Sequence, residues 1–149
     1  MIEYLEGAKA QGENFKCMLW GTVYANLPVI GNRSAASILM LFSPAPGVSG
    51  MINNAFCYIG LTERTLYVIA LDAYDTSRIL GTFALPLAGI TSLKTRKTPL
   101  GPHVVVIECG EYVKLSIKNT SLGTNIKDQK ERAEEFLAEM ELLKERVSG

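Results

Sequence analysis

Hydrophobic and polar residues alternate along several stretches of this chain, with the two-residue period that is typical of β-strands. The clearest case is residues 112–118, where Val113, Leu115 and Ile117 fall on one face and polar side chains on the other. Two other stretches flank the polar turn 62–64 and predict a hairpin. In all, the pattern predicts seven strands, at residues 15–24, 56–61, 65–71, 78–85, 90–97, 103–109 and 112–118.

Helical periodicity appears at the two ends of the chain. Residues 128–147 predict a long amphipathic helix, in which Asp128 and Glu131 suit a capping box at its start. Residues 2–10 predict a short helix. The long helix must bury its apolar stripe against the strands, and that stripe consists of Ala133, Phe136, Leu137, Met140, Leu143 and Val147.

Residues 83–93, F-A-L-P-L-A-G-I-T-S-L, predict a corner at which the sheet bends. The turn is expected at residues 87–89. Ile90 and Leu93 have opposite parity in the strand that follows, which predicts a bulge or a register change between them. Gly81 predicts a bend or a bulge in the strand before. The side chains of that earlier strand that are expected to face inward are Ile79, Phe83 and Leu85.

Residues 25–54 form an insertion that is longer and more apolar than an ordinary connection. No residue from 34 to 62 is charged, but prolines, glycines and asparagines interrupt this segment, so we do not expect it to cross a membrane. Its continuous apolar run has two interpretations: a surface for a partner or for self-association, or an extra core layer folded over Trp20 and Tyr24. The run consists of Ile38, Leu39, Met40, Leu41 and Phe42.

The composition is that of one globular domain spanning residues 1–149, with 48% hydrophobic and 20% charged residues. The net charge of zero argues against nucleic acid as a partner, because such binding needs many phosphate contacts. Cys17, Cys57 and Cys109 lie far apart inside apolar runs, which suggests buried free thiols in a reducing compartment. No signal peptide is visible in M-I-E-Y-L-E-G-A-K, so we expect a cytoplasmic protein.

No pattern in the sequence predicts a catalytic, metal or cofactor site. His103 is the only histidine and has no nucleophile or acid at a suggestive spacing. Asp72 and Asp75 lie in a stretch of turn-forming residues, which accounts for both carboxylates. We therefore expect a protein that is not an enzyme and that needs no cofactor.

One cluster of basic residues could bind an anion. Lys94, Arg96 and Lys97 lie just before a tight turn, and arginine and lysine side chains both suit phosphate groups. Strand alternation places Lys94 and Arg96 on one face and Lys97 on the other. The two interpretations are a site for an anionic lipid head group and a solvated strand end.

Taken in order, these motifs resemble a known family. The run F-C-Y-I-G-L-T-E-R-T-L-Y-V-I-A-L resembles the hairpin of bacterial pleckstrin-homology-like (PH-like) domains, and F-A-L-P-L-A-G-I-T-S-L resembles the corner that follows it there. The run V-V-V-I-E-C-G-E-Y-V-K-L-S-I-K and the C-terminal helix complete the pattern over about residues 56–147. The resemblance implies a seven-stranded, bent antiparallel β-barrel capped at one end by that helix. From periodicity alone, a sandwich and a barrel both remain open.

The family resemblance also shapes the expected function. Members of this superfamily bind membrane lipids, peptides or partner proteins, or assemble with themselves. We therefore expect a non-enzymatic binding or assembly module that takes a protein partner or a second copy of itself. The alternative is a peripheral module at the inner face of the membrane that binds anionic lipid head groups.

Overall fold

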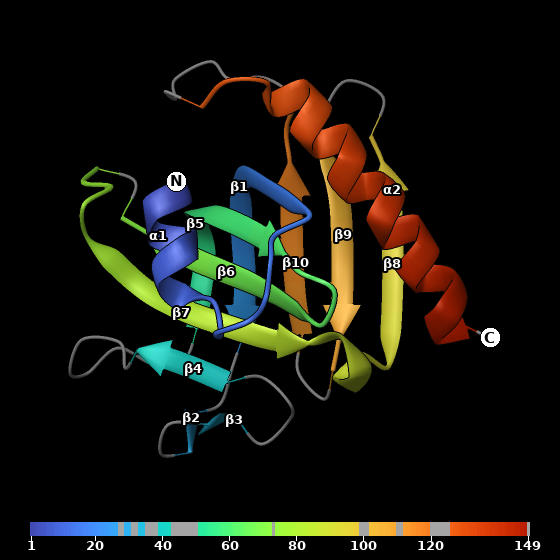
Figure 1. Ribbon diagram of the computed structural model, residues 1–149, viewed down its shortest axis with the longest axis horizontal. Helices are drawn as coiled ribbons and strands as arrows, with labels where there is room; N and C mark the ends of the chain where they lie inside the picture. Colours follow the sequence, from blue (N-terminus) through green and yellow to red (C-terminus); the bar gives the residue numbers. More distant parts are fainter. Residues whose placement is uncertain are drawn as a thin grey trace.

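A computed structural model describes residues 1–26, 29–30, 33–34, 39–42, 51–72, 74–98, 102–109, 112–119 and 126–148 (Figure 1). Its helices are α1 (Ile2–Ala8), the short 3-10 helix η1 (Leu87–Gly89) and α2 (Gln129–Ser148). Its strands are β1 (Cys17–Asn26), β2 (Val29–Ile30), β3 (Arg33–Ser34), β4 (Leu39–Phe42), β5 (Met51–Leu61), β6 (Thr65–Leu71), β7 (Ile79–Pro86), β8 (Ser92–Lys97), β9 (His103–Glu108) and β10 (Tyr112–Ile117).

The strands form one antiparallel sheet in the order β2-β3-β4-β7-β6-β5-β1-β10-β9-β8. The seven predicted strands correspond to β1 and β5 to β10, and the predicted hairpin is β5–β6. The fold is therefore mainly β, with a short N-terminal helix and a long C-terminal helix, as the sequence predicts.

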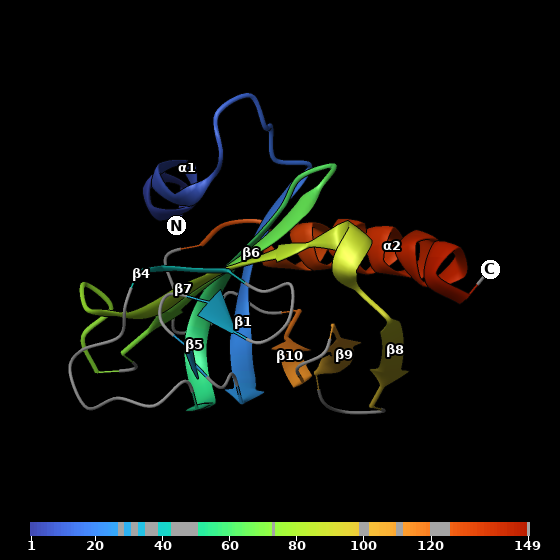
Figure 2. The ribbon, with the colours of Figure 1, turned by 90° about the horizontal axis from the view of Figure 1, so that it is seen from below.

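The sheet bends but does not close, so the predicted closed barrel is wrong. In the described part of the chain β8 pairs with β9 alone, and the outer side of β7 pairs with β4 rather than with β8. Helix α2 lies over β8, β9 and β10, in the layer that β6 and β7 occupy farther along (Figures 1 and 2). The helix thus covers the side of the core that further strand pairing would cover in a closed barrel.

The main core lies between this layer and β1, β10 and β9. The predicted apolar stripe of α2 faces the main core, in which Phe136 and Met140 are fully buried. The predicted alternation of β10 is also confirmed, with Val113, Leu115 and Ile117 at 2% exposure or less. The periodicity of the sequence therefore identified the core-facing side of both elements.

A second, smaller core lies on the opposite face of the sheet, under α1. Leu5 of α1 is fully buried against Tyr67, Ile69 and Leu71 of β6. Phe15 packs in this cluster and not beside Cys17 in the main core, because it precedes the first residue of β1 and strand alternation does not reach it. Helix α1 therefore has the packing partner that a helix of its length needs.

The predicted corner is present, with one change in its interpretation. The turn is η1, where the Leu87 N–H donates to the Arg64 carbonyl at 2.9 Å and ties the corner to the β5–β6 hairpin. Ile90 caps η1 before β8 begins, so its parity with Leu93 needs no bulge. The corner is thus a helical turn between two regular strands.

The bend predicted at Gly81 is a register shift in β7. Ala70 pairs with Gly81, whereas the neighbouring Leu71 pairs with Ile79. The extra residue reverses the faces of β7 at this point, so Ile79 is 40% exposed and its predicted inward position is wrong. Beyond the shift, Phe83 and Leu85 face the core as predicted.

The insertion contributes β4, whose backbone extends the sheet beyond β7. The side chains of Leu39, Met40, Leu41 and Phe42, and the whole of Ile38, lie outside the described residues, so both interpretations of this run stay predictions. None of the described helices has the length and apolar character needed to cross a bilayer.

The N-terminal end of α2 is anchored where β1 and β10 separate. Their ladder ends at Thr22 and Ser116, and in the same register Gly21 would face Ile117 and Trp20 would face Lys118. The Gln129 amide lies between these two residues: its Nε2 donates to the Trp20 carbonyl at 2.9 Å and to the Lys118 carbonyl at 3.0 Å. Its Oε1 accepts from the Trp20 N–H at 3.3 Å. A side chain thus takes the place of strand pairing.

The predicted capping box is not the feature that holds this end of the helix. Asp128 has a φ of 61°, in the left-handed region, whereas an ordinary N-cap residue is extended. Two residues before Trp20 in β1, the Met18 carbonyl accepts a hydrogen bond from Arg132 Nη1 at 3.0 Å. The first turn of α2 is therefore held by side chains that reach β1.

Candidate functional site: the free edge of β8 and the groove beside α2

Strand β8 is the last strand of the sheet. It pairs with β9 from Ser92–Glu108 to Lys97–His103, and no other described strand pairs with it. One row of its backbone N–H and C=O groups is therefore not used by a neighbouring strand, which makes this edge a template for an added strand.

Helix α2 fixes which face of β8 each side chain takes. Leu93 is buried in the main core, and Thr95 Oγ1 donates to Glu141 Oε1 of α2 at 2.6 Å. Odd-numbered positions of β8 therefore face α2, and even-numbered positions face outward. Lys94 and Arg96 share the outer face while Lys97 lies on the side of α2, as strand alternation predicts. The three cations line one edge but do not converge on one point.

A groove of about 330 Å³ lies where the end of β8 meets α2. Leu137 and Ala138 give it an apolar side, and the beginning of β9 closes it through His103. The remaining lining residues are polar or charged: Thr95, Arg96, Lys97 and Glu141. An extended segment placed along β8 would therefore direct alternate side chains toward this groove.

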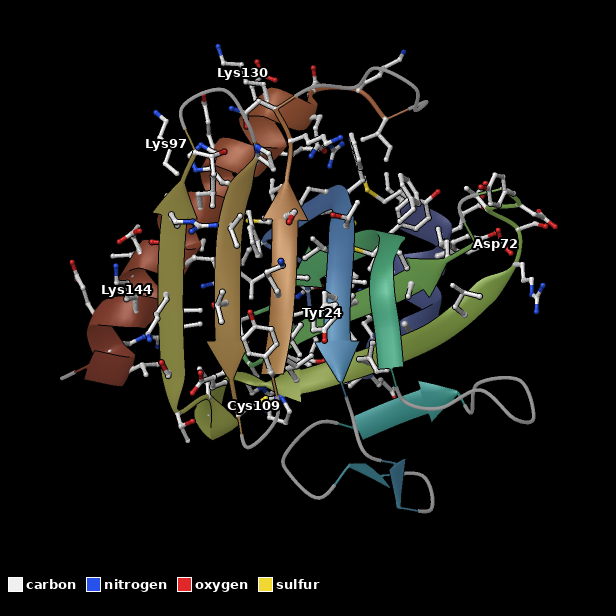
Figure 3. All side chains as sticks on the ribbon, turned by 180° about the vertical axis from the view of Figure 1, so that it is seen from behind. Tyr24, Asp72, Lys97, Cys109, Lys130 and Lys144 are labelled. Carbon is white, nitrogen blue, oxygen red and sulfur yellow. The ribbon has the colours of Figure 1, made fainter. Side chains whose placement is uncertain are left out.

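The edge of β8 carries three cationic side chains, and the groove beside it holds one carboxylate, that of Glu141. Lys94, Arg96 and Lys97 are exposed, and none forms an ion pair with another described residue. Lys114 of β10 lies in the same cross-strand row as Lys94, through Val106 of β9. The outer face of the sheet, opposite α2, is seen directly in Figure 3, where Lys97 lies at the end of β8.

Other residues singled out in the sequence have structural roles. Asp72 Oδ1 accepts from the Tyr74 N–H at 2.8 Å, and Asp75 Oδ1 accepts from the Ser77 N–H at 3.1 Å, which confirms the turn chemistry. His103 begins β9 opposite Lys97. Within the described ranges, no three residues among His, Cys, Asp and Glu gather at a place that could hold a metal ion.

The cysteines are buried thiols outside disulfide bonds, as the sequence predicts. Burial, followed by the charges of Glu135 and Glu139, raises the pKa of Cys17 to about 11. Burial also raises the pKa of Cys57. These two thiols stay protonated at neutral pH and are therefore poor nucleophiles.

A second polar cluster, which no pattern in the sequence predicted, surrounds Glu13. This carboxylate is 8% exposed and lies against the turn of the β5–β6 hairpin. Its Oε1 accepts from Thr62 Oγ1 at 3.0 Å and from Thr65 Oγ1 at 2.8 Å, and its Oε2 accepts from the Tyr67 hydroxyl. The Tyr67 oxygen in turn accepts from the Ala10 N–H at 2.8 Å. The cluster therefore ties the α1–β1 loop to the hairpin.

The charge state of Glu13 makes this cluster sensitive to pH. Burial raises the pKa of Glu13, but the three hydroxyl donors and the Ala10 backbone lower it by more, so it lies below its usual value. The stabilisation is therefore complete above the unfolded-state pKa and is lost as the pH falls through the lower folded-state pKa.

Glu13→Gln is expected to lower the free energy of unfolding by about 1–3 kcal/mol at pH 7, because a hydroxyl donor loses a charged acceptor. The difference between the variant and the wild type should shrink as the pH falls through the lowered folded-state pKa of Glu13, since the wild-type carboxylate then becomes neutral too. Urea denaturation over a pH series measures both effects. Glu3→Gln, on exposed α1, is the control; equal pH profiles for all three proteins would contradict the prediction.

Comparison of the chain with protein-family models, with curated proteins and with solved structures finds no match. Function is therefore inferred from the described surface of this chain. Its strongest feature is the edge of β8, which is lined by cations and lies beside a partly apolar groove.

Proposed function

We propose that this protein is a non-enzymatic interaction module that adds an extended, acidic segment of a partner protein to the free edge of β8. The observation that carries the proposal is the edge of β8, which no other described strand pairs with, beside the groove against α2; its three cations form no ion pair with a described residue. In such binding, backbone hydrogen bonds give affinity and alternate side chains give specificity.

The charge of the edge favours an acidic partner over a second copy of the chain. If two copies paired through β8, each would bring Lys94, Arg96 and Lys97 to the other, and like charges on paired strands are destabilising by roughly 0.2–1 kcal/mol per pair. Charged edge residues discourage such self-pairing in many sheets. A strand with Glu or Asp at alternate positions would instead gain favourable pairs with Lys94 and Arg96.

A PH-like fold is part of the same proposal. It is supported by the bent antiparallel sheet, by the β5–β6 hairpin with its following corner, and by a C-terminal helix that covers one open side. Reduced, buried thiols fit a cytoplasmic location.

The test uses a fluorescein-labelled octapeptide of alternating Glu and Val, with a Lys-Val octapeptide as the charge control. The Glu-Val peptide should bind the wild type, and Lys94→Glu/Arg96→Glu/Lys97→Glu should weaken that binding at least tenfold in fluorescence anisotropy. Methylation of alternate backbone nitrogens on the peptide should abolish binding, because strand addition needs those N–H groups. The matched control, Lys118→Glu/Lys127→Glu/Lys130→Glu, makes the same change in net charge at exposed sites outside β8.

Two results would contradict strand addition: no binding of the Glu-Val peptide, or equal loss of binding in both triple variants. The alternative of an anionic lipid site is favoured by Lys114, which joins Lys94 on the outer face. It predicts that phosphatidylglycerol vesicles pellet the wild type, that the β8 variant stays in solution, and that binding weakens with salt.

A further inference from the structure

A hollow of about 820 Å³ lies at the C-terminal end of α2 and shares no lining residue with the β8 groove. Four segments that are far apart in the sequence surround it: the α1–β1 loop, the β5–β6 turn, η1 and the last turns of α2. Figure 2 shows η1 beside the C-terminal half of α2. The volume is within the range of small-molecule sites, about 300–1,000 Å³.

One side of the hollow is apolar. Leu87 and Ile90 come from the corner, and Leu143 and Val147 come from α2. Ile90 and Leu143 are also part of the main core, at 7% and 5% exposure, so this wall is held in place by packing. Such a wall suits a hydrocarbon chain.

The other side carries charges of both signs. Arg64 of the hairpin turn and Arg146 of α2 are exposed at the hollow, and neither forms an ion pair with another described residue. Glu13 also lines it, but both of its oxygens already accept hydrogen bonds from hydroxyl groups. Glu63 is exposed to solvent, as the two arginines are, so water screens all three charges alike. The cationic side chains that line the hollow are the two guanidinium groups.

We propose that this hollow binds a single-chain amphiphile with a carboxylate head, such as a fatty acid. The carboxylate would lie between Arg64 and Arg146, whose planar donors match its geometry. The hydrocarbon chain would lie along Leu87, Leu143 and Val147. This site is separate from the β8 edge and does not depend on the function proposed for it.

The probe is dodecanoate, titrated below its micelle concentration by isothermal calorimetry. Acetate tests the need for the chain; dodecanol and dodecyltrimethylammonium test the need for the negative head. Dodecanoate should bind at least tenfold more tightly than any of the three. Arg64→Gln/Arg146→Gln should weaken dodecanoate binding at least tenfold while circular dichroism and the melting temperature stay close to those of the wild type, because both side chains are exposed.

The matched control is Lys94→Gln/Arg96→Gln, which removes two exposed cations from β8. It should leave dodecanoate binding unchanged while weakening the Glu-Val peptide, so the two proposals can fail separately. Three results would overturn the inference: no dodecanoate binding to the wild type, equal binding of the cationic amphiphile, or equal affinity in the Arg64/Arg146 variant.

Discussion

Replacing Phe136 by alanine is expected to lower the free energy of unfolding by about 3–5 kcal/mol. Phe136 is fully buried in the middle of α2 and is among the largest buried side chains of the protein. It belongs to the main core, together with buried residues of β1 and of β5 to β10. Because the backbone around it belongs to a helix and a sheet that cannot collapse into the vacated space, the cavity term adds to the lost burial. Urea denaturation at neutral pH measures the change.

The same helix supplies a control for this substitution. Leu142 is 58% exposed, so Leu142→Ala should change the free energy of unfolding by no more than about 0.5 kcal/mol. If Phe136→Ala cost as little as Leu142→Ala, α2 would not be the cover of the open side of the sheet, and the architecture described above would be wrong.

The contrast between the buried Phe136 and the exposed Leu142 shows what periodicity can predict. A helix or strand that packs with one face must place its apolar residues at a fixed spacing, so the faces of α2 and β10 can be read from the sequence. Closure of a sheet into a barrel produces no periodic pattern in the sequence, because closure depends on which strand edges meet. The pairing of β4 with β7 and the position of α2 depend on contacts between residues far apart in the sequence. The prediction of a closed barrel could not take these contacts into account and is wrong.

The site residues divide in the same way. The split of Lys94 and Arg96 from Lys97 follows from strand alternation and was predictable. Glu13 and Gln129 were not, because their partners lie far away in the sequence: Thr62 is 49 positions from Glu13, and Trp20 is 109 positions from Gln129. A lone acid in a loop and a glutamine at the start of a helix are ordinary surface residues by type. Only the fold shows that both are buried.

Helix α2 also connects the two proposed sites. Leu137, Ala138 and Glu141 line the β8 groove, and Leu143 and Arg146, nearer the C-terminus of the helix, line the hollow. Both sites therefore depend on the position of one helix against the sheet. Side chains that hold its first turn should consequently matter for stability and for both kinds of binding.

Gln129→Ala tests that dependence and is expected to lower the free energy of unfolding by about 2–4 kcal/mol. The substitution removes three hydrogen bonds from a side chain that is 1% exposed, and it leaves the Lys118 carbonyl and the Trp20 carbonyl without the amide between them.

The measurement is urea denaturation together with amide hydrogen exchange. The substitution should increase the exchange rate more at Ile117, at the separated end of β10, than at Val105 in the middle of the sheet. The reason is that the lost hydrogen bonds are local to that end. Lys130→Ala, at the exposed neighbouring position of α2, should leave both quantities within error of the wild type. Gln129→Glu should be at least as harmful as alanine, because a carboxylate offers no donor to the two carbonyl groups. A stable Gln129→Glu protein would show that strand pairing, and not this side chain, holds β1 and β10 together.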